Sequence, residues 1–213
     1  MTIIAQISSS VVHDYNWLKA TVADWMHRTN LTGQIPDCIA FTESRTTRLL
    51  NARMQELQAP LATVAGQQYA SLPSDLLRVM SVSIPQSSPS LDYVTMDQLN
   101  MEYDPSYSGV PLIYTTLGDL IYFGPTPDAI YNCSLTYKYQ VPQLSDAAPE
   151  NSLLTKWPDV YLWGALYHAA KYSENLPKAQ QYESDYLRAV DEINVIDWHA
   201  GGPMRMRSDV RSV

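Results

Sequence analysis

Few residues in this sequence belong to the types that carry catalysis. The chain has two cysteines and four histidines, and no two histidines lie three or four residues apart. This spacing excludes a pair of histidine metal ligands on one helical face. The sequence also lacks a glycine-rich phosphate loop and the HExxH, CxxC and GxSxG motifs. We therefore predict no catalytic residue, no cofactor and no bound metal.

The remaining candidates for chemistry have simpler structural interpretations. His168 lies in an apolar helical segment, where a hydrogen-bonded core histidine is more common than a catalytic one. Cys38 and His168 can be drawn as a nucleophile pair across two helices, but any chain with both residue types permits such a drawing. Four carboxylates form an irregular series that favours a solvated surface: Asp92, Asp97, Glu102 and Asp104.

Composition excludes several classes of protein. The 213 residues suit one domain, or one domain with a large insertion, and a hydrophobic fraction of 46% excludes a disordered chain. The formal charge of −8 argues against a basic face that binds nucleic acid. Met1–Val12 lacks the basic start of a signal peptide, and no run approaches the ~20 apolar residues that span a bilayer. We expect Cys38 and Cys133 to be buried and reduced.

The segment Leu153–Asp197 predicts two helices joined by a short turn. Pro158 and Pro177 each suit the first turn of a helix, where a missing N–H costs nothing. The first helix is apolar on most sides, as a buried helix is, and Gly164 within it permits a close approach by a neighbour. The second helix has a single apolar stripe: Tyr182, Tyr186, Val190 and Ile193. A break of about four residues between them favours an antiparallel helical hairpin.

Two further helices are predicted before the middle of the chain. Asp14–Met26 has a capping aspartate and apolar residues at helical spacing, and Pro36–Met54 follows a short loop. Three arginines in the second of these helices suit its C-terminal half, where cations favour the helix dipole: Arg45, Arg48 and Arg53. A solvated face is the more frequent explanation for them, and a face toward a partner is the alternative.

Between these helical segments the hydrophobic period changes to two. Tyr131–Val141 alternates apolar and polar residues most strictly and predicts a strand with Leu135 inside. Met80–Ile84 predicts another strand. Leu112–Thr116 and Leu120–Phe123 flank a glycine-containing turn, which predicts a β-hairpin. Shorter signals favour a strand at Leu91–Val94 and a helix at Met96–Met101.

These patterns predict an α+β fold. We expect a helical bundle of about four helices with an inserted antiparallel β-region and an extended C-terminal arm. The predicted boundaries are 1–54 for the N-terminal helices, 55–150 for the β-rich insertion, 151–197 for the C-terminal helical hairpin and 198–213 for the arm.

The predicted arm alternates arginines with apolar residues after a Gly-Gly-Pro break. A frayed terminus is one interpretation, and an extended arm that becomes ordered on a partner is the other. In the second interpretation, six residues would make the contacts: Met204, Arg205, Met206, Arg207, Val210 and Arg211.

A series of short patterns follows one another along nearly the whole chain, to about Asp197. The patterns are Leu18 with Trp25–Leu31, Ile35–Asp37, Glu43–Arg45, Ser71–Asp75, Tyr137–Leu144, Asn151–Leu154 and Pro158–Leu166 with Ala169, Ala170 and Tyr172. In this order they resemble the head-to-tail adaptor (connector) proteins of tailed bacteriophages.

The resemblance implies a structural role in the virion. Members of this family form a ring, typically of about twelve copies, beneath the portal of the DNA-filled head. The ring extends the DNA channel used in genome packaging and DNA ejection, and the tail or nozzle assembles on it. A C-terminal extension docks on the portal, DNA passes without specific binding, and the family has no catalytic residues. The protein would be made in the host cytoplasm and would reside at the head–tail junction, with no membrane partner.

Two other functions are consistent with the sequence. A different virion ring protein, such as a head-completion stopper or a tail terminator, would share the absence of a catalytic site. A small hydrolase with a cleft between helices and sheet is the alternative from another class, although no readable motif pairs a nucleophile with a base.

Overall fold

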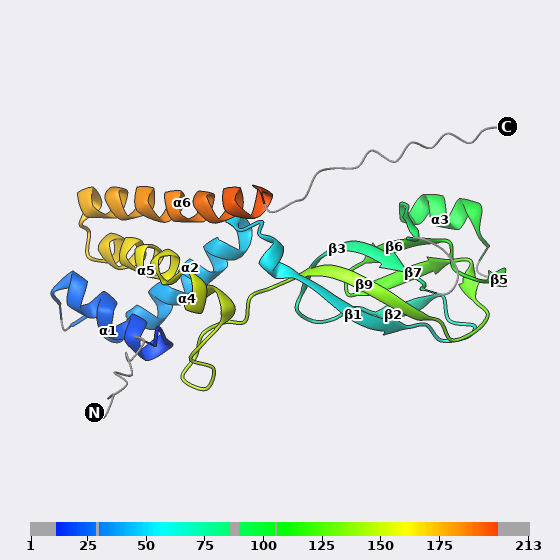
Figure 1. Cartoon of the computed structure of the whole chain (residues 1–213), viewed down its shortest axis with the longest axis horizontal. Helices are drawn as coiled ribbons and strands as arrows, with labels where there is room; N and C mark the ends of the chain where they lie inside the picture. The colour runs from blue at the N-terminus through cyan, green and yellow to red at the C-terminus, as the bar shows by residue number, and fades with distance from the viewer. Residues whose placement is uncertain (1–11, 29, 86–89, 105, 200–213) are drawn as a thin grey trace, which may run out of the picture. The chain divides into compact units, whose positions relative to one another are not determined.

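The computed structural model describes residues 12–28, 30–85, 90–104 and 106–199. The chain divides into two compact units (Figure 1). One unit, Met1–Ala52 with Val141–Val213, is called the helical unit here, and the other, Arg53–Gln140, is called the β unit. The β unit is therefore inserted between two stretches of chain that fold together.

The described part of the helical unit contains five α-helices. They are α1 (Tyr15–Met26), α2 (Ile35–Leu49), α4 (Ser152–Lys156), α5 (Pro158–Tyr172) and α6 (Leu176–His199). Four of them correspond to the predicted helices, and α4 is an additional short helix. The α+β class is thus confirmed, while the helical part is more than a set of about four helices.

Local chemistry explains where several helices begin. The Asp14 carboxylate accepts a hydrogen bond from the Trp17 N–H at 2.6 Å and caps α1 as predicted. The Asn151 side-chain oxygen accepts from the Leu154 N–H at 2.8 Å and caps α4. Pro158 is the first residue of α5, where its missing N–H leaves no hydrogen bond unmade.

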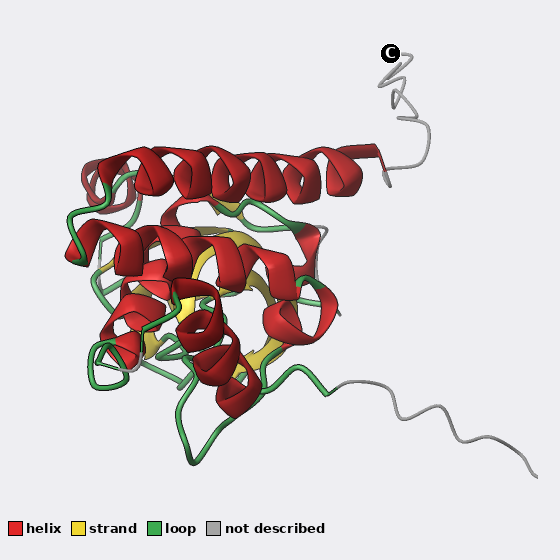
Figure 2. Ribbon diagram, turned by 90° about the vertical axis from the view of Figure 1, so that its left-hand side faces the viewer, coloured by secondary structure: helices red, strands yellow, loops and turns green. Residues whose placement is uncertain are grey.

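Helix α5 forms the centre of the helical unit. It packs against α6, α2 and α1, and Figure 2 shows the long α6 lying along it. The predicted apolar stripe of α6 is buried: Tyr182, Tyr186, Val190 and Ile193. A helix with neighbours on several sides must be apolar on most of its surface, which is the pattern seen in the sequence of α5.

Gly164 is a point of close approach between α5 and α2. A β-carbon at this position would lie 3.2 Å from the Thr42 Cβ and would overlap the Thr42 methyl group. The sequence-based expectation of a close approach at this glycine is confirmed. Gly164 costs the isolated helix about 1 kcal/mol relative to alanine, and the contact with Thr42 explains why alanine does not fit.

Helix α2 ends at Leu49 rather than at Met54, so the predicted length was wrong. The side-chain amide of Asn194 in α6 donates to the Leu49 carbonyl at 3.2 Å and accepts from the Asn51 N–H at 2.8 Å. These bonds satisfy backbone groups that the end of a helix leaves unpaired. The next residue, Leu50, is extended and buried, and the chain then leads into the β unit.

The described part of the β unit contains nine strands, one α-helix and a short 3₁₀ turn, η1 (Arg53–Gln55). The strands are β1 (Glu56–Ala62), β2 (Tyr69–Ser71), β3 (Leu76–Ser83), β4 (Asp92–Tyr93), β5 (Ser108–Gly109), β6 (Ile113–Leu117), β7 (Leu120–Gly124), β8 (Thr126–Pro127) and β9 (Asn132–Tyr139). The helix α3 (Met96–Glu102) lies where a short helix was predicted.

Two sheets enclose the core of the β unit. One sheet has the order β1-β9-β3 and the other β2-β7-β6-β4, while β5 and β8 form a separate short pair. Strand β9 is central in its sheet and pairs antiparallel with both neighbours. Leu135 of β9 is fully buried in an apolar cluster that draws residues from both sheets, so the predicted strand with Leu135 inside is confirmed. The predicted hairpin is confirmed as β6 and β7.

The β unit is not purely antiparallel, which corrects the predicted topology. Strands β4 and β6 pair in parallel, as do β5 and β8. After β4 the chain passes through α3 and β5 before it returns as β6, and such a crossover allows a parallel neighbour. Strands β1, β2, β5 and β8 were not predicted. Pro60 interrupts the pattern of β1 and is tolerated because β1 is an edge strand.

Candidate interaction surface

His168 lies between aromatic rings and is poorly placed for acid–base chemistry. Its ring centroid is 4.7 Å from that of Tyr167 and 5.6 Å from that of Phe41. The Nε2 atom is buried and has no hydrogen-bond partner among the described residues, so the predicted hydrogen bond is not present there. Burial, together with the nearby Arg45 and Lys171, lowers the pKa of His168 to about 4. The imidazole is therefore neutral at physiological pH.

The two cysteines are buried, unpaired thiols, as predicted. Burial raises the pKa of Cys38 to about 11, and it raises the pKa of Cys133 to about 11 as well. A thiol must lose its proton to act as a nucleophile, and these thiols keep theirs at physiological pH. This argues against the drawn pairing of Cys38 with His168.

The acidic series of the β unit is exposed to solvent, as expected. Asp97 lies in the first turn of α3, where a carboxylate favours the helix dipole. The Asp104 carboxylate accepts hydrogen bonds from the Ser106 N–H and hydroxyl group, and the hydroxyl bond in particular lowers the pKa of Asp104. Within the described ranges, no group of three or more His, Cys, Asp or Glu side chains could hold a metal ion.

Arg45 connects three helices instead of forming a solvated face. Its guanidinium donates to the Glu183 carboxylate at 2.6 Å and lies 5.0 Å from the Tyr167 ring and 5.3 Å from the Tyr186 ring. These partners come from α5 and α6, so Arg45 of α2 joins all three. The expectation of a solvated cation is wrong for Arg45. It holds for the exposed Arg48, and the side chain of Arg53 lies outside the described residues.

A buried polar network holds the chain where it re-enters the helical unit. The Glu43 carboxylate of α2 accepts hydrogen bonds from the Leu144 N–H at 2.8 Å and from the Tyr161 hydroxyl at 3.4 Å. The Tyr161 hydroxyl in turn accepts from the Asn151 amide at 2.7 Å, and that amide also donates to the Pro142 carbonyl at 2.8 Å. Burial raises the pKa of Glu43, because no cation among the described residues lies beside it to offset the desolvation.

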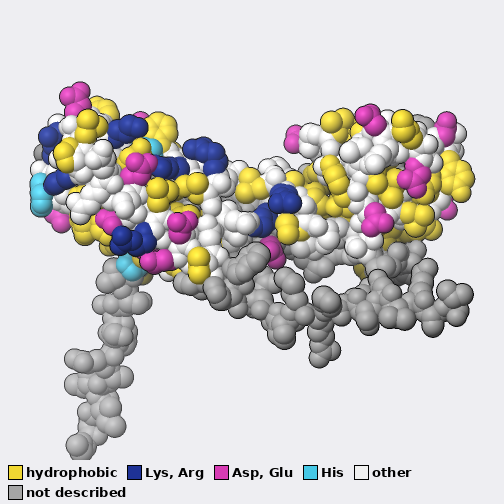
Figure 3. Space-filling model, turned by 90° about the horizontal axis from the view of Figure 1, so that it is seen from above, with side chains coloured by type: hydrophobic (Ala, Val, Ile, Leu, Met, Phe, Trp, Pro, Cys, Tyr) yellow, Lys and Arg dark blue, Asp and Glu magenta, His cyan; other side chains and the backbone are white. Residues whose placement is uncertain are grey.

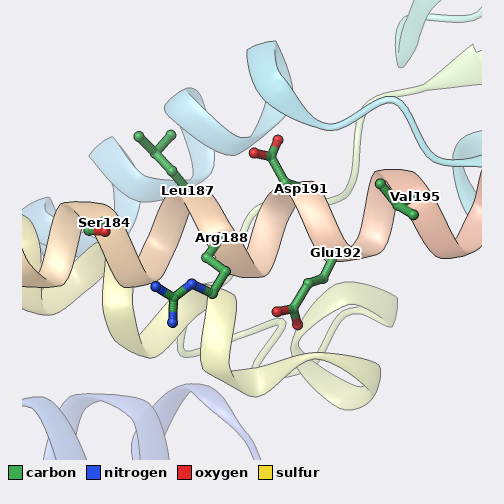
Figure 4. Close-up of a pocket in the computed structure, with 6 residues that line it drawn as sticks. All are labelled: Ser184, Leu187, Arg188, Asp191, Glu192 and Val195. Atoms are coloured by element: carbon green, nitrogen blue, oxygen red, sulfur yellow. The ribbon is translucent and has the colours of Figure 1, made fainter.

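The outward side of α6 carries an open pocket. Six described residues line it, and all belong to α6: Ser184, Leu187, Arg188, Asp191, Glu192 and Val195. Figure 4 shows Leu187 and Asp191 on one side of the helix and Arg188 and Glu192 on the other. Leu187 is 37% exposed and Val195 is 55% exposed, and none of the three charges is ion-paired within the described part of the chain. We call these six residues the α6 pocket.

The predicted contact residues of the arm lie outside the described residues: Met204, Arg205, Met206, Arg207, Val210 and Arg211. The structure therefore does not test their role. It does show that α6 continues to His199, immediately before this segment. The α6 pocket is thus close in sequence to the arm.

The surface of the β unit is acidic over most of its length. Residues 79–137 contain no Lys or Arg and six carboxylates: Asp92, Asp97, Glu102, Asp104, Asp119 and Asp128. Large apolar side chains are exposed among them, including Tyr93, Met101 and Tyr107. Figure 3 shows Asp and Glu side chains interspersed with hydrophobic ones over this unit. Such a surface repels nucleic acid and suits contact with protein.

Sequence reasoning missed three features that the fold creates. The Glu43 network and the Arg45 contacts join residues more than 100 positions apart, and no local pattern indicates them. The α6 pocket left a readable signal. Two apolar residues, Leu187 and Val195, lie eight residues apart on the side of α6 away from its buried stripe. An apolar residue repeated on the outer side of an amphipathic helix indicates a surface for contact.

The described part of the chain thus combines a helical unit, an inserted β unit and an exposed mixed pocket on α6. Comparison with known families identifies the class of protein. The family model described as SU10 adaptor protein matches residues 14–207. The chain therefore belongs to the SU10 adaptor protein family, a family of phage head-to-tail adaptors and thus of virion components. A search of curated proteins found no match.

None of the helices in the described part of the chain has the length and apolar character of a membrane-spanning segment.

Proposed function

We propose that this protein is a subunit of the adaptor ring that joins the portal of a phage head to its tail. In this role the ring extends the DNA channel, and tail or nozzle proteins assemble on it. The ring contains about twelve copies, the number typical of the head-to-tail adaptors that the sequence resembles. The family match over residues 14–207 carries this proposal, because it spans both units rather than one of them.

The C-terminal arm is the proposed attachment to the portal. The family match continues through Met204–Arg207, so it includes the start of this segment. In an extended chain, the alternation of Arg205 and Arg207 with Met204 and Met206 places cations on one side and apolar groups on the other. Such a segment fits a crevice with acidic walls and an apolar floor.

The charge distribution supports passage of DNA without specific binding. The chain has a formal charge of −8, and residues 79–137 contain no cation that could pair with a phosphate. Affinity for DNA depends on Lys and Arg contacts to phosphates. A ring of acidic subunits therefore lets DNA slide, because its wall repels the backbone.

Cryo-electron microscopy of the purified protein with and without purified portal rings tests the proposal. We expect a ring of this protein on the portal, coaxial with its channel. Binding to a different virion ring in place of the portal would identify a stopper or a tail terminator. Quantitative mass spectrometry of virions checks the stoichiometry, and a single copy per particle would contradict the ring.

A further inference from the structure

The α6 pocket presents chemical groups in a fixed order along the helix axis. From its C-terminal end toward the N-terminus come an apolar group (Val195), two carboxylates (Glu192 and Asp191), a cation (Arg188) and a second apolar group (Leu187). Figure 4 shows these side chains along one stretch of α6. The outer apolar groups are exposed and the charges between them lack ion-pair partners within the described part of the chain.

The segment Met206–Val210, Met-Arg-Ser-Asp-Val, has the complementary order. An apolar residue comes first, then a cation (Arg207), then an anion (Asp209), and then an apolar residue. In an extended chain aligned antiparallel to α6, Arg207 and Asp209 point to one side, where they would face Glu192 and Arg188. Met206 and Val210 point to the other side, where they would meet Val195 and Leu187.

The distance between the two apolar residues of the α6 pocket agrees with the distance between the two apolar residues of the segment. Leu187 and Val195 are eight residues apart, which corresponds to about 12 Å at the helical rise of ~1.5 Å per residue. Met206 and Val210 are four residues apart, which corresponds to about 13 Å in an extended chain at ~3.3 Å per residue. Met206 and Val210 can therefore contact Val195 and Leu187 at the same time.

The connecting chain is long enough to reverse direction. Helix α6 ends at His199, about 6 Å beyond Val195 along its axis by the helical rise. Residues 200–205 connect this end to Met206 and contain Gly201, Gly202 and Pro203. Glycine and proline in succession are typical of a tight reversal of the chain.

We propose that the α6 pocket is an intramolecular docking site for residues 206–210 of the same chain. The arm is thereby held against α6 in the free protein. Its docking is weak, because ordering the arm opposes the gain from partly exposed anchors and surface ion pairs. The docking does not require a portal. Its consequence, that a portal must displace the arm from α6 before attachment, rests on the proposed function.

Paramagnetic relaxation in the full-length protein tests this docking. Ser208→Cys places a single reactive thiol in the arm for a nitroxide label, because Cys38 and Cys133 are buried. Helix α6 amides from Leu187 to Val195 should broaden strongly in dilute ¹⁵N-labelled protein, and more strongly than the amide of Val160, which is buried in the neighbouring helix α5. Unbroadened α6 amides would overturn the proposal.

Charge variants distinguish docking from chance proximity. Asp191→Lys with Glu192→Lys should abolish the broadening, and adding Arg207→Glu should restore it. The matched control Asp24→Lys with Glu150→Lys changes two exposed carboxylates outside the pocket and should leave the broadening intact. If broadening survives the pocket variant, the proposed contact is wrong.

Isotope mixing identifies whose arm occupies the pocket. Unlabelled protein carrying the nitroxide is mixed with ¹⁵N-labelled protein that lacks it. No broadening is expected in the mixture, and broadening there would mean that the arm docks on a second copy. Portal binding is measured separately by co-sedimentation, so a failure of the proposed function leaves the docking result interpretable. If both hold, the Asp191→Lys, Glu192→Lys variant should attach to portal rings faster than the wild type.

Discussion

At the scale of single residues, Glu43 is the side chain whose burial needs the most explanation. It is 7% exposed and accepts two hydrogen bonds, yet no cation lies beside it in the described structure. A buried carboxylate without a cation is costly in its charged form, and its acceptor role offsets part of that cost. That role is to bind Leu144 and Tyr161, which fixes the returning chain to α2 and α5.

Glu43→Gln should change how stability depends on pH. Burial raises the folded-state pKa of Glu43 above its ordinary value of 4.5, so the folded protein binds this proton more tightly than the unfolded chain does. Its contribution to stability is complete below pH 4.5 and is lost as the pH rises through the folded-state pKa. Glutamine keeps an acceptor oxygen without a charge and should remove this loss.

Urea unfolding between pH 4 and pH 8 measures the effect of Glu43→Gln. We expect the variant to be at least as stable as the wild type at pH 7. Glu43→Ala is the comparison, because it leaves the Leu144 N–H without its acceptor and should cost about 1–3 kcal/mol. A pH profile of Glu43→Gln that coincides with the wild type would contradict the assignment.

Gly164→Ala should destabilise the helical unit although alanine favours helices. The added methyl group would overlap the Thr42 side chain. Overpacking of this kind costs about 1–3 kcal/mol, and an overlap as severe as this one belongs to the upper part of that range, above the gain of about 1 kcal/mol in helix propensity. Thermal unfolding of Gly164→Ala should show a lower melting temperature.

Two further variants control this result. Adding Thr42→Ser removes the overlapping methyl group, keeps a hydroxyl that can bond to the Cys38 carbonyl, and should restore most of the lost stability. Gly33→Ala places a methyl group where no atom lies within 4 Å and should be nearly neutral. Equal losses at Gly164 and Gly33 would show that the contact with Thr42 is unimportant.

At the scale of elements, β9 organises the β unit. It pairs with β1 on one side and β3 on the other, and Leu135 faces Ala59 and Val82 across these pairings. Leu135→Ala should cost about 2–5 kcal/mol, since it opens a cavity at a fully buried position. Leu57→Ala on the edge strand β1 is the matched control, because Leu57 is 45% exposed. Equal losses of stability in urea unfolding would show that β9 is not the centre of this core.

In the whole molecule, the two folded units provide the stability, and we expect the C-terminal arm to provide the attachment to the portal. Deleting Met204–Val213 should leave the melting temperature almost unchanged, because a weakly docked arm adds little to the stability of the folded units. The same deletion should abolish stable attachment to portal rings, which co-sedimentation measures. A truncated protein that co-sediments as tightly as the full-length chain would show that the arm is only a terminus.

Features that depend on local periodicity and local chemistry could be predicted from the sequence. The period-two alternation around Leu135 and the helical stripe around Tyr186 each follow from one buried side of one element. Asp14 and Pro158 act on backbone groups within their own first helical turns, so their roles were readable as well. The sequence also showed that readable catalytic motifs are absent, and its short patterns carried the family resemblance.

Contacts between distant elements could not be predicted from the sequence and became known from the fold. Asn194 ends α2 from a position far along the chain, and Glu43 binds Leu144 across the inserted β unit in the sequence. The sequence predicted a solvated Arg45, but in the fold its guanidinium contacts the Tyr167 and Tyr186 rings and the Glu183 carboxylate. Hydrogen bonds and ring contacts between distant segments depend on how elements pack, and packing leaves no periodic trace in either segment.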